Sequence, residues 1–230
     1  MNAPLQEAAS RAAAPAARAR VPAGLRLRRA LLLSRATKPV VFALAASPFV
    51  VLVWRALHSE LGANPAQQVI WTTGLWALRM LMITLAVTPL RVITGWVELA
   101  RLRRMLGLFA FGYALLHFTS YLGLVNDFSL VEVAHDVVRH PFVLAGMSAL
   151  LLMLPLALTS TNAMVRRLGG ARWRALHKLV YAIGVIAVFH YWWGKLAKNN
   201  TADPKVYALL LGALLGWRVA QALRARARRA

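Results

Sequence analysis

The chain has 230 residues, of which 60% are hydrophobic and only 15% are charged. A soluble domain is about half apolar and about a quarter charged, so this composition excludes an ordinary soluble enzyme. The chain has 28 Lys and Arg residues against 7 acidic residues, which gives a net charge of +21. It contains no cysteine, which excludes disulfides, iron–sulfur clusters, thiolate-bound zinc and a covalently attached c-type haem.

An Ala-, Arg- and Pro-rich segment, residues 1–38, opens the chain and is predicted to be a disordered basic tail. Apolar stretches follow, each near the ~20 residues with which a helix crosses a hydrocarbon layer of about 30 Å. They are predicted, in chain order, at 40–57, 73–90, 105–124, 141–159, 175–193 and 204–223. A second basic tail is predicted at 224–230. The expected fold is therefore an all-α membrane protein, with a six-transmembrane-helix bundle over residues 39–223 embedded in the lipid bilayer.

The Lys and Arg residues gather on one side of the predicted membrane. The two terminal regions and the second and fourth connections hold twenty-one of the 28, whereas the three other connections hold four. Basic residues collect in the cytoplasmic loops of membrane proteins, so both termini are predicted to be cytoplasmic. This orientation accounts for the net charge, and nucleic acid is not an expected partner.

Two histidines are predicted to lie at the same depth in the membrane. His117 and His190 fall on the third and fifth predicted helices, which both run outward, and their depths differ by only about 5 Å at 1.5 Å per residue. Ionisable side chains inside a membrane are costly, which makes each a functional candidate. Without cysteine or a nearby carboxylate, a b-type haem held by both imidazoles fits best. The alternative for each histidine is a hydrogen bond to a neighbouring helix.

Two further residues are candidates for cofactor binding. His177 lies 13 residues before His190, about 20 Å deeper toward the inner side, where its counterpart on the third helix is Arg104. A second bis-His haem is therefore not supported by these helices. His177 and the basic stretch 166–174 are interpreted either as ordinary cytoplasmic charge or as a site for a flavin phosphate or a quinone. Arg79, at the outer depth, is interpreted either as a partner of a haem propionate or as a side chain that snorkels to the interface.

Three segments carry a resemblance to a known family: LGLFAFGYALLHFTSYLGL, LALTSTNAMVRRLG and WRALHKLVYAIGVIAVFHYWW. From about residue 40 to 223 the chain resembles the MsrQ family, formerly YedZ. These are haem-binding membrane subunits of bacterial methionine sulfoxide reductase systems, within the ferric-reductase-like transmembrane group. The resemblance implies that His117, His177 and His190 are the family's three characteristic histidines, with haem b and FMN as cofactors. The long N-terminal tail departs from the family pattern.

The resemblance also implies a partner on each side of a bacterial inner membrane. Electrons are expected to come from the quinone pool or a cytosolic flavin reductase, because the chain has no Gly-rich dinucleotide fingerprint of its own. They are expected to reach a periplasmic molybdopterin subunit, MsrP, which repairs oxidised methionines, so no catalytic residue is expected in this chain. Acidic residues of the predicted outer connections are interpreted as a docking surface for that partner or as charge that merely lies opposite the basic side: Glu60, Asp127, Glu132, Asp136 and Asp203.

Two other functions stay open from the residues alone. One is a transmembrane b-type cytochrome of the same build that reduces ferric iron or oxygen. The other is a haem-free membrane permease or scaffold, in which the histidines only hold helices together.

Overall fold

The structure, a computed structural model, describes residues 33–196 and 202–228. The predicted N-terminal tail lies outside the described residues as far as residue 32. The chain divides into a short unit, Met1–Ser34, and a second unit, Arg35–Ala230, which contains every described helix of membrane length. All regular elements in the described residues are helices.

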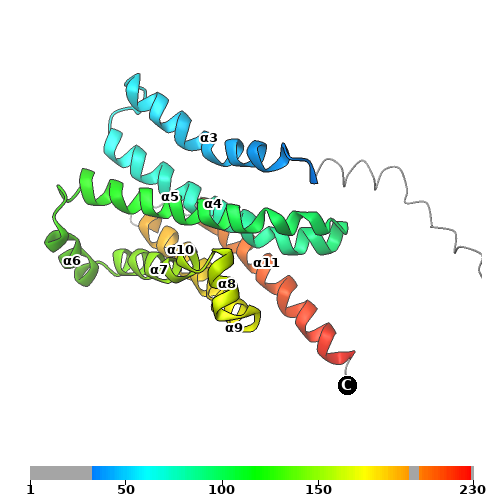
Figure 1. The fold of residues 1–230 in the computed structure, drawn as a ribbon. Helices are drawn as coiled ribbons and strands as arrows, with labels where there is room; N and C mark the ends of the chain where they lie inside the picture. Colours follow the sequence, from blue (N-terminus) through cyan, green and yellow to red (C-terminus); the bar gives the residue numbers. More distant parts are fainter. Residues whose placement is uncertain (1–32, 197–201, 229–230) are drawn as a thin grey trace, which may run out of the picture. The chain divides into compact units, whose positions relative to one another are not determined.

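The described part of the chain contains six helices long and apolar enough to cross a membrane (Figure 1). They are α3 (Thr37–Leu57), α4 (Pro65–Thr94), α5 (Arg103–Leu124), α7 (Pro141–Leu158), the segment Gly170–Leu196 whose main helix is α10 (Leu179–Leu196), and α11 (Ala202–Ala227). Shorter helices connect them: η1 (Val97–Arg101), α6 (Leu130–Arg139), α8 (Asn162–Leu168) and α9 (Gly170–Leu176). The predicted all-α fold with six membrane-spanning helices is confirmed.

Several predicted helix ends were wrong by four residues or more, among them the start of α4 and the end of α11. The polar stretch before residue 73 was interpreted as a connection, but α4 already begins at Pro65. The side chain of Asn64 accepts a hydrogen bond from the Gln67 backbone N–H at 3.0 Å, and proline at the first helical position needs no N–H partner. At the other end of the chain, α11 continues to Ala227, into the segment predicted as a tail.

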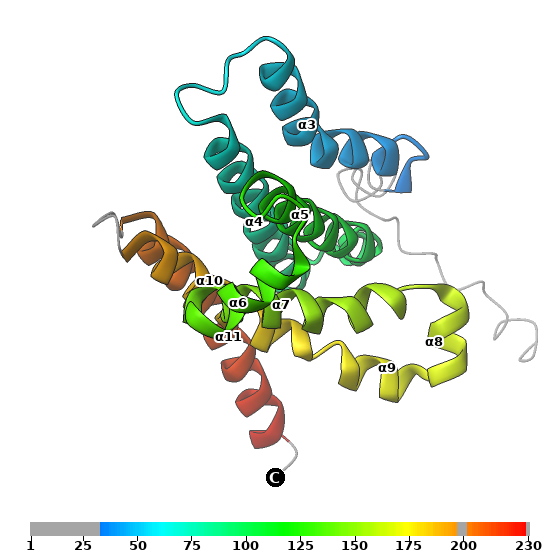
Figure 2. The same cartoon turned by 90° about the vertical axis from the view of Figure 1, so that its left-hand side faces the viewer.

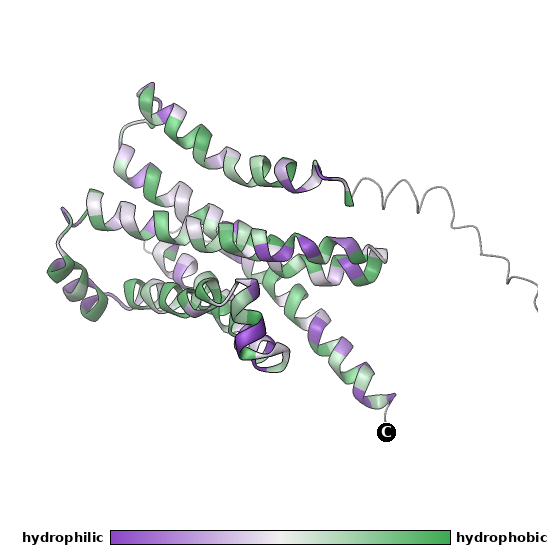
Figure 3. Ribbon diagram, viewed as in Figure 1, coloured by the Kyte–Doolittle hydropathy of each residue, from purple (hydrophilic) through white to green (hydrophobic). Residues whose placement is uncertain are grey.

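Helix α6 was not predicted, because its residues were assigned to an outer connection. It begins after Ser129, whose side chain accepts a hydrogen bond from the Glu132 backbone N–H at 3.2 Å. Ser-x-x-Glu is the sequence signature of a capping box, so the signal was present at this position. Figure 3 shows polar and apolar residues on α6, and only Val133 of this helix is buried. Helix α6 is therefore amphipathic.

The fifth predicted helix is interrupted at His177. Helix α9 ends at Leu176 and α10 begins at Leu179, so a turn at His177 and Lys178 interrupts the fifth spanning segment, Gly170–Leu196, which contains both His177 and His190 as predicted. The interruption places His177 at a junction between two helices, on the basic side of the chain.

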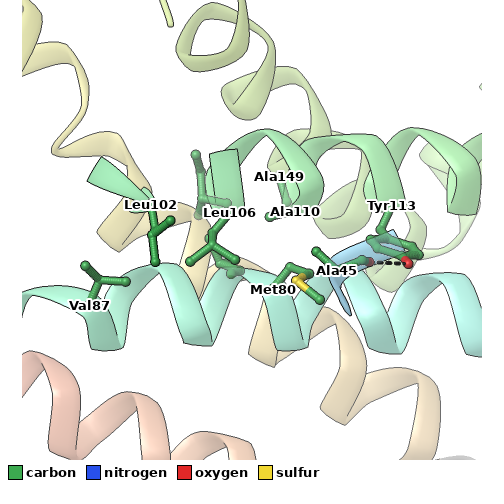
Figure 4. Close-up of a cluster of buried hydrophobic side chains, with 10 residues drawn as sticks. Ala45, Met80, Val87, Leu102, Leu106, Ala110, Tyr113 and Ala149 are labelled. Carbon is green, nitrogen blue, oxygen red and sulfur yellow. Dashed lines mark hydrogen bonds between the residues drawn. The ribbon is translucent and has the colours of Figure 1, made fainter. Parts of the chain in front are cut away.

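Large apolar side chains cover the outside of the spanning helices. Phe42, Leu44 and Val50 of α3 are 56%, 65% and 61% exposed, and Figure 3 shows α3 and α7 as largely apolar. Surfaces of this kind face lipid. Because lipid is as apolar as leucine, helix association in a membrane depends on close packing of small residues. The buried cluster in Figure 4 accordingly joins Ala45 of α3, Ala110 of α5 and Ala149 of α7.

Tyr113 fastens α3 to α5 at the place where α3 contains a proline. Pro48 has no N–H, so the regular hydrogen-bond ladder of α3 is interrupted there. The Tyr113 hydroxyl donates to the Ala45 carbonyl at 2.8 Å, as Figure 4 shows, and accepts from the Phe49 backbone N–H at 3.2 Å. One hydroxyl thus joins a carbonyl and an N–H four residues apart, and it satisfies backbone groups that lipid cannot.

Two helix pairs hold the rest of the bundle together. Helix α4 packs along α5, and α7 packs along α10. Figures 1 and 2 show α4 and α5 side by side from both directions. Helix α10 also contacts α4, and α5 contacts α7, so the two pairs meet.

Candidate functional site

His117 lies on α5 and is fixed by α4. Its Nδ1 is 2.8 Å from the backbone carbonyl oxygen of Ile70. A carbonyl has no proton to give, so Nδ1–H is the donor and Nε2 of the neutral ring carries the free lone pair. This is the tautomer that an imidazole needs in order to bind a metal through Nε2.

His190 lies on α10 and is fixed in the same way by α7. Its Nδ1 is 2.6 Å from the carbonyl oxygen of Phe142, and the Phe142 ring stacks on it with centroids 6.1 Å apart. Nδ1–H is again the donor, so Nε2 is again free to act as a ligand. The two helix pairs therefore present one imidazole each.

The structure brings His117 and His190 close together, which their matching predicted depths allow. Their ring centroids are 6.1 Å apart, with an angle of 73° between the ring planes. A nitrogen ligand lies about 2.0–2.1 Å from a metal and the ring centre about 1.1 Å further, so rings on opposite sides of one ion have centroids about 6.3 Å apart. The spacing of the two rings therefore fits a single metal ion that His117 and His190 would hold between them. In the described residues, no group of three or more His, Cys, Asp or Glu offers a competing metal site.

His177 lines a cavity of about 560 Å³ on the basic side of the bundle. Its ring stacks on Trp173 with centroids 3.9 Å apart, and its Nδ1 is 3.0 Å from the Trp173 carbonyl oxygen. Its Nε2 is buried and has no hydrogen-bond partner in the described residues. The other polar residues of the cavity wall include five cationic side chains and no carboxylate: Arg103, Arg104, Arg174, Lys178 and Arg218.

Arg218 is a cavity residue that the sequence analysis did not single out. Its Nη2 donates to the Leu85 carbonyl at 2.8 Å, and its Nη1 donates to the Tyr181 hydroxyl at 3.0 Å. The Leu85 carbonyl is available because Pro89, four residues later, has no N–H to donate to it. The Arg218 Nε is buried without a partner among the described residues. Pro89 and Arg218 are both visible in the sequence as an intramembrane proline and an arginine. Their connection through the Leu85 carbonyl can be seen only in the folded chain.

Comparison with known proteins identifies the family. The model of the ferric reductase like transmembrane component matches residues 70–188, about half of the chain. The haem-binding MsrQ subunit of the protein-methionine-sulfoxide reductase from Polaromonas naphthalenivorans is 47% identical over 188 residues, which are 82% of this chain and 86% of the relative. The chain belongs to the MsrQ family. Within it, the same subunit of Herminiimonas arsenicoxydans is 48% identical over 182 residues, covering 79% of this chain and 84% of that one.

A third MsrQ relative, from Ralstonia nicotianae, is 48% identical over 185 residues, covering 80% of this chain and 85% of that relative. No solved structure matches the chain. His117 and His177 lie inside the residues matched by the family model, and His190 follows two residues after them. The family membership and the six apolar helices together make this a multi-pass membrane protein.

Arg79, on α4, points toward α11 in this MsrQ-family chain. Its Nε donates to the Tyr207 hydroxyl at 3.0 Å, and its guanidinium lies 4.8 Å from the ring centre of Trp76. It has no carboxylate partner in the described residues. Contact between Arg79 and a haem propionate stays a prediction.

One of the five predicted outer acidic residues is engaged inside the protein. The Tyr121 hydroxyl of α5 donates to the Asp136 carboxylate of α6, and His140 Nδ1 lies 3.3 Å from the same carboxylate. Asp136 therefore fastens α6 to the helix that carries His117. Asp127 and Glu132 are exposed and make no such contact through their carboxylates in the described part of the chain.

Proposed function

We propose that this chain is the haem b electron-transfer subunit of a bacterial methionine sulfoxide reductase system in the inner membrane. The observation that carries the proposal is the pair His117 and His190, each held on a backbone carbonyl with its Nε2 free. The relatives' names, which describe haem-binding subunits of such reductases, support it. When bound, haem supplies a one-electron iron couple whose potential depends on its axial ligands and on the hydrogen bonds behind them. The sulfoxide chemistry is assigned to a periplasmic molybdopterin partner, MsrP.

The proposed orientation places both termini in the cytoplasm. The charge distribution supports it, because the connections that hold η1, α8 and α9 are basic whereas the others hold few Lys or Arg. In Figure 1 the α3–α4 turn and α6 both lie at the left end of the helices, apart from each other, whereas α8 and α9 lie further to the right. Electrons therefore enter near the cavity that His177 lines and leave near α6.

We propose the cavity as the place where the inner donor acts, through FMN, a quinone or both. Its volume of about 560 Å³ lies within the ordinary range for small-molecule sites, roughly 300–1,000 Å³. Five cations without a carboxylate favour an anionic group such as the FMN phosphate. Arg218 has a buried Nε without a partner and is our candidate for the group that recognises the phosphate. A cytosolic flavin reductase or the quinone pool is the proposed electron source.

Arg218→Leu is expected to weaken FMN binding about 10- to 100-fold, because a charge-assisted hydrogen bond is lost. The measurement is a fluorescence titration of the purified chain with FMN and with riboflavin, which has no phosphate. The wild-type chain should favour FMN, and the variant should lose that preference. Arg224→Leu, on an exposed position of the same helix, is the matched control. Equal affinity of the wild-type chain for FMN and riboflavin would contradict the phosphate assignment.

The visible spectrum of the purified chain tests the proposed function directly. We expect the absorption bands of a low-spin b-type haem that dithionite reduces. The expected haem content is about one per chain, because His117 and His190 together would bind one haem. A haem-free preparation would favour a permease or scaffold. A haem protein that reduces ferric iron or oxygen but does not pass electrons to a periplasmic reductase would favour the other alternative.

Arg79 is proposed to reach a haem propionate from the α4 side. The support is its guanidinium charge, which no carboxylate neutralises in the described residues. Its bond to Tyr207 uses only Nε, so the two terminal nitrogens stay available for a carboxylate.

A further inference from the structure

Each of the two facing histidines lies directly against a glycine of the neighbouring helix. A Cβ atom added to Gly74 of α4 would lie 2.9 Å from Nδ1 of His117. A Cβ added to Gly146 of α7 would lie 2.8 Å from Cε1 of His190. Real Cβ atoms essentially never approach other atoms below 3.0 Å, so alanine at either position would force the imidazole to move.

The two glycines share one register relative to the carbonyls that hold the histidines. Gly74 follows Ile70 by four residues, and Gly146 follows Phe142 by four residues. In an α-helix the Cα–Cβ bond tilts toward the N-terminus, so the side chain at i+4 covers the carbonyl of residue i. With glycine at i+4, the carbonyl oxygen keeps its hydrogen bond within the helix, and its second lone pair can accept a hydrogen bond from a neighbouring side chain. The same device therefore occurs once in each helix pair.

We propose that Gly74 and Gly146 are positioning residues for the two axial ligands, an inference that rests on the proposed haem site. By leaving the Ile70 and Phe142 carbonyls uncovered, they let each imidazole lie on the neighbouring helix and donate Nδ1–H. This bond fixes both the ring plane and the tautomer, so that Nε2 is the ligating atom. Glycine destabilises a helix interior relative to alanine. The close approach of an imidazole gives a reason for glycine at both positions.

The proposal has a spectroscopic consequence. A ligating imidazole that donates its second N–H to a carbonyl is more basic at the other nitrogen, and such outer partners tune the metal. A more basic ligand favours the ferric form of the iron. Lengthening or losing the bond should therefore raise the midpoint potential and weaken haem retention.

The test compares Gly74→Ala and Gly146→Ala with two matched controls on the histidine-bearing helices. A Cβ at Gly112 of α5 or at Gly194 of α10 would meet nothing within 4 Å. Alanine favours helix at all four positions, so a defect confined to the first two cannot come from helix propensity. The measurements are haem content per inserted protein and a redox titration of the haem bands in the full-length chain.

We expect Gly74→Ala and Gly146→Ala to retain haem about 10- to 100-fold less tightly, as for other outer-shell changes. In molecules that keep haem, the ferrous-to-ferric ratio at a fixed potential should rise about tenfold, which is about 59 mV for a one-electron couple. Gly112→Ala and Gly194→Ala should behave as wild type. Wild-type haem content and midpoint potential in both Gly74→Ala and Gly146→Ala, or equal changes in the two control variants, would overturn the proposal.

Two further outcomes separate this proposal from the haem assignment. If His117→Ala and His190→Ala lose haem but the glycine variants do not differ from wild type, the ligands are right and the positioning role is wrong. If both glycine variants lose their helical circular dichroism along with haem, the glycines serve helix packing rather than ligand orientation, which also overturns the proposal.

Discussion

Alanine at His117 or at His190 is expected to abolish haem binding while the protein stays inserted in the membrane. Each imidazole supplies one of the two proposed axial ligands, and no other histidine, cysteine or carboxylate cluster in the described residues offers a replacement. Neither histidine holds helices together through its Nε2, so each substitution removes one interhelical hydrogen bond, worth about 1 kcal/mol, and leaves most of the packing intact. The measurement is the reduced-minus-oxidised spectrum of membranes, normalised to the amount of inserted protein.

His177→Ala and His58→Ala are the controls for this experiment. His177 lies at the α9–α10 junction and lines the cavity on the basic side, which is proposed to face the cytoplasm, so its variant should keep the haem bands but slow their reduction from that side. His58 is exposed and stacks on Trp54, with centroids 3.9 Å apart, and its variant should match wild type. Full haem retention in either His117→Ala or His190→Ala would exclude the pair as ligands. Haem loss in His177→Ala alone would show that the assigned depths are wrong.

The matching depths of the histidine pair could be predicted from the sequence for a simple physical reason. The length of an apolar stretch fixes where a helix crosses the bilayer, and the rise of 1.5 Å per residue then fixes the depth of each side chain. This arithmetic and an orientation from the basic loops predict matching depths for His117 and His190, whereas the packing that brings their helices together is not contained in it. The structure agrees, with ring centroids 6.1 Å apart.

Other features depend on contacts that a one-dimensional pattern does not contain. The bond from Arg218 to the Leu85 carbonyl joins residues 133 positions apart, and the approach of His117 to Gly74 depends on how α4 and α5 are rotated. The interruption at His177 has no glycine or proline at the break to announce it. Helix α6 is different, because its Ser129–Glu132 capping pattern is a local signal that the sequence itself contains.

The isolated chain is expected not to reduce methionine sulfoxide, even when its haem has been reduced. The proposed function assigns the sulfoxide chemistry to the partner, and His117 and His190 would both be engaged in holding the haem. Adding the proposed periplasmic molybdopterin subunit in catalytic amount together with excess methionine sulfoxide should reoxidise the haem completely, whereas sulfoxide alone should not, and the subunit alone should accept no more electrons than its own centre holds. The measurement is the decay of the reduced haem bands after mixing. Sulfoxide reduction by the isolated chain would refute the division of labour.

The acidic residues of the α6 region are proposed to guide that partner to the protein. Asp127 and Glu132 are exposed, whereas Asp136 is tied to Tyr121 and His140 and is better left intact because its loss would loosen α6. The double variant Asp127→Asn and Glu132→Gln should slow reoxidation by up to about tenfold at low salt, because long-range charge steering raises association rates.

The salt dependence decides whether those carboxylates steer the partner. Exposed charges are screened beyond about 10 Å at 0.1 M ionic strength, so the difference between the double variant and wild type should shrink as salt is added. Glu60→Gln removes a carboxylate from the α3–α4 turn, which lies at the same end of the helices as α6 but does not pack on it, and should leave the rate unchanged if docking depends on the α6 region itself. An equal slowing by Glu60→Gln would mean that only the total charge of this side matters. An unaffected double variant would refute the docking site and leave the division of labour between the two subunits untouched.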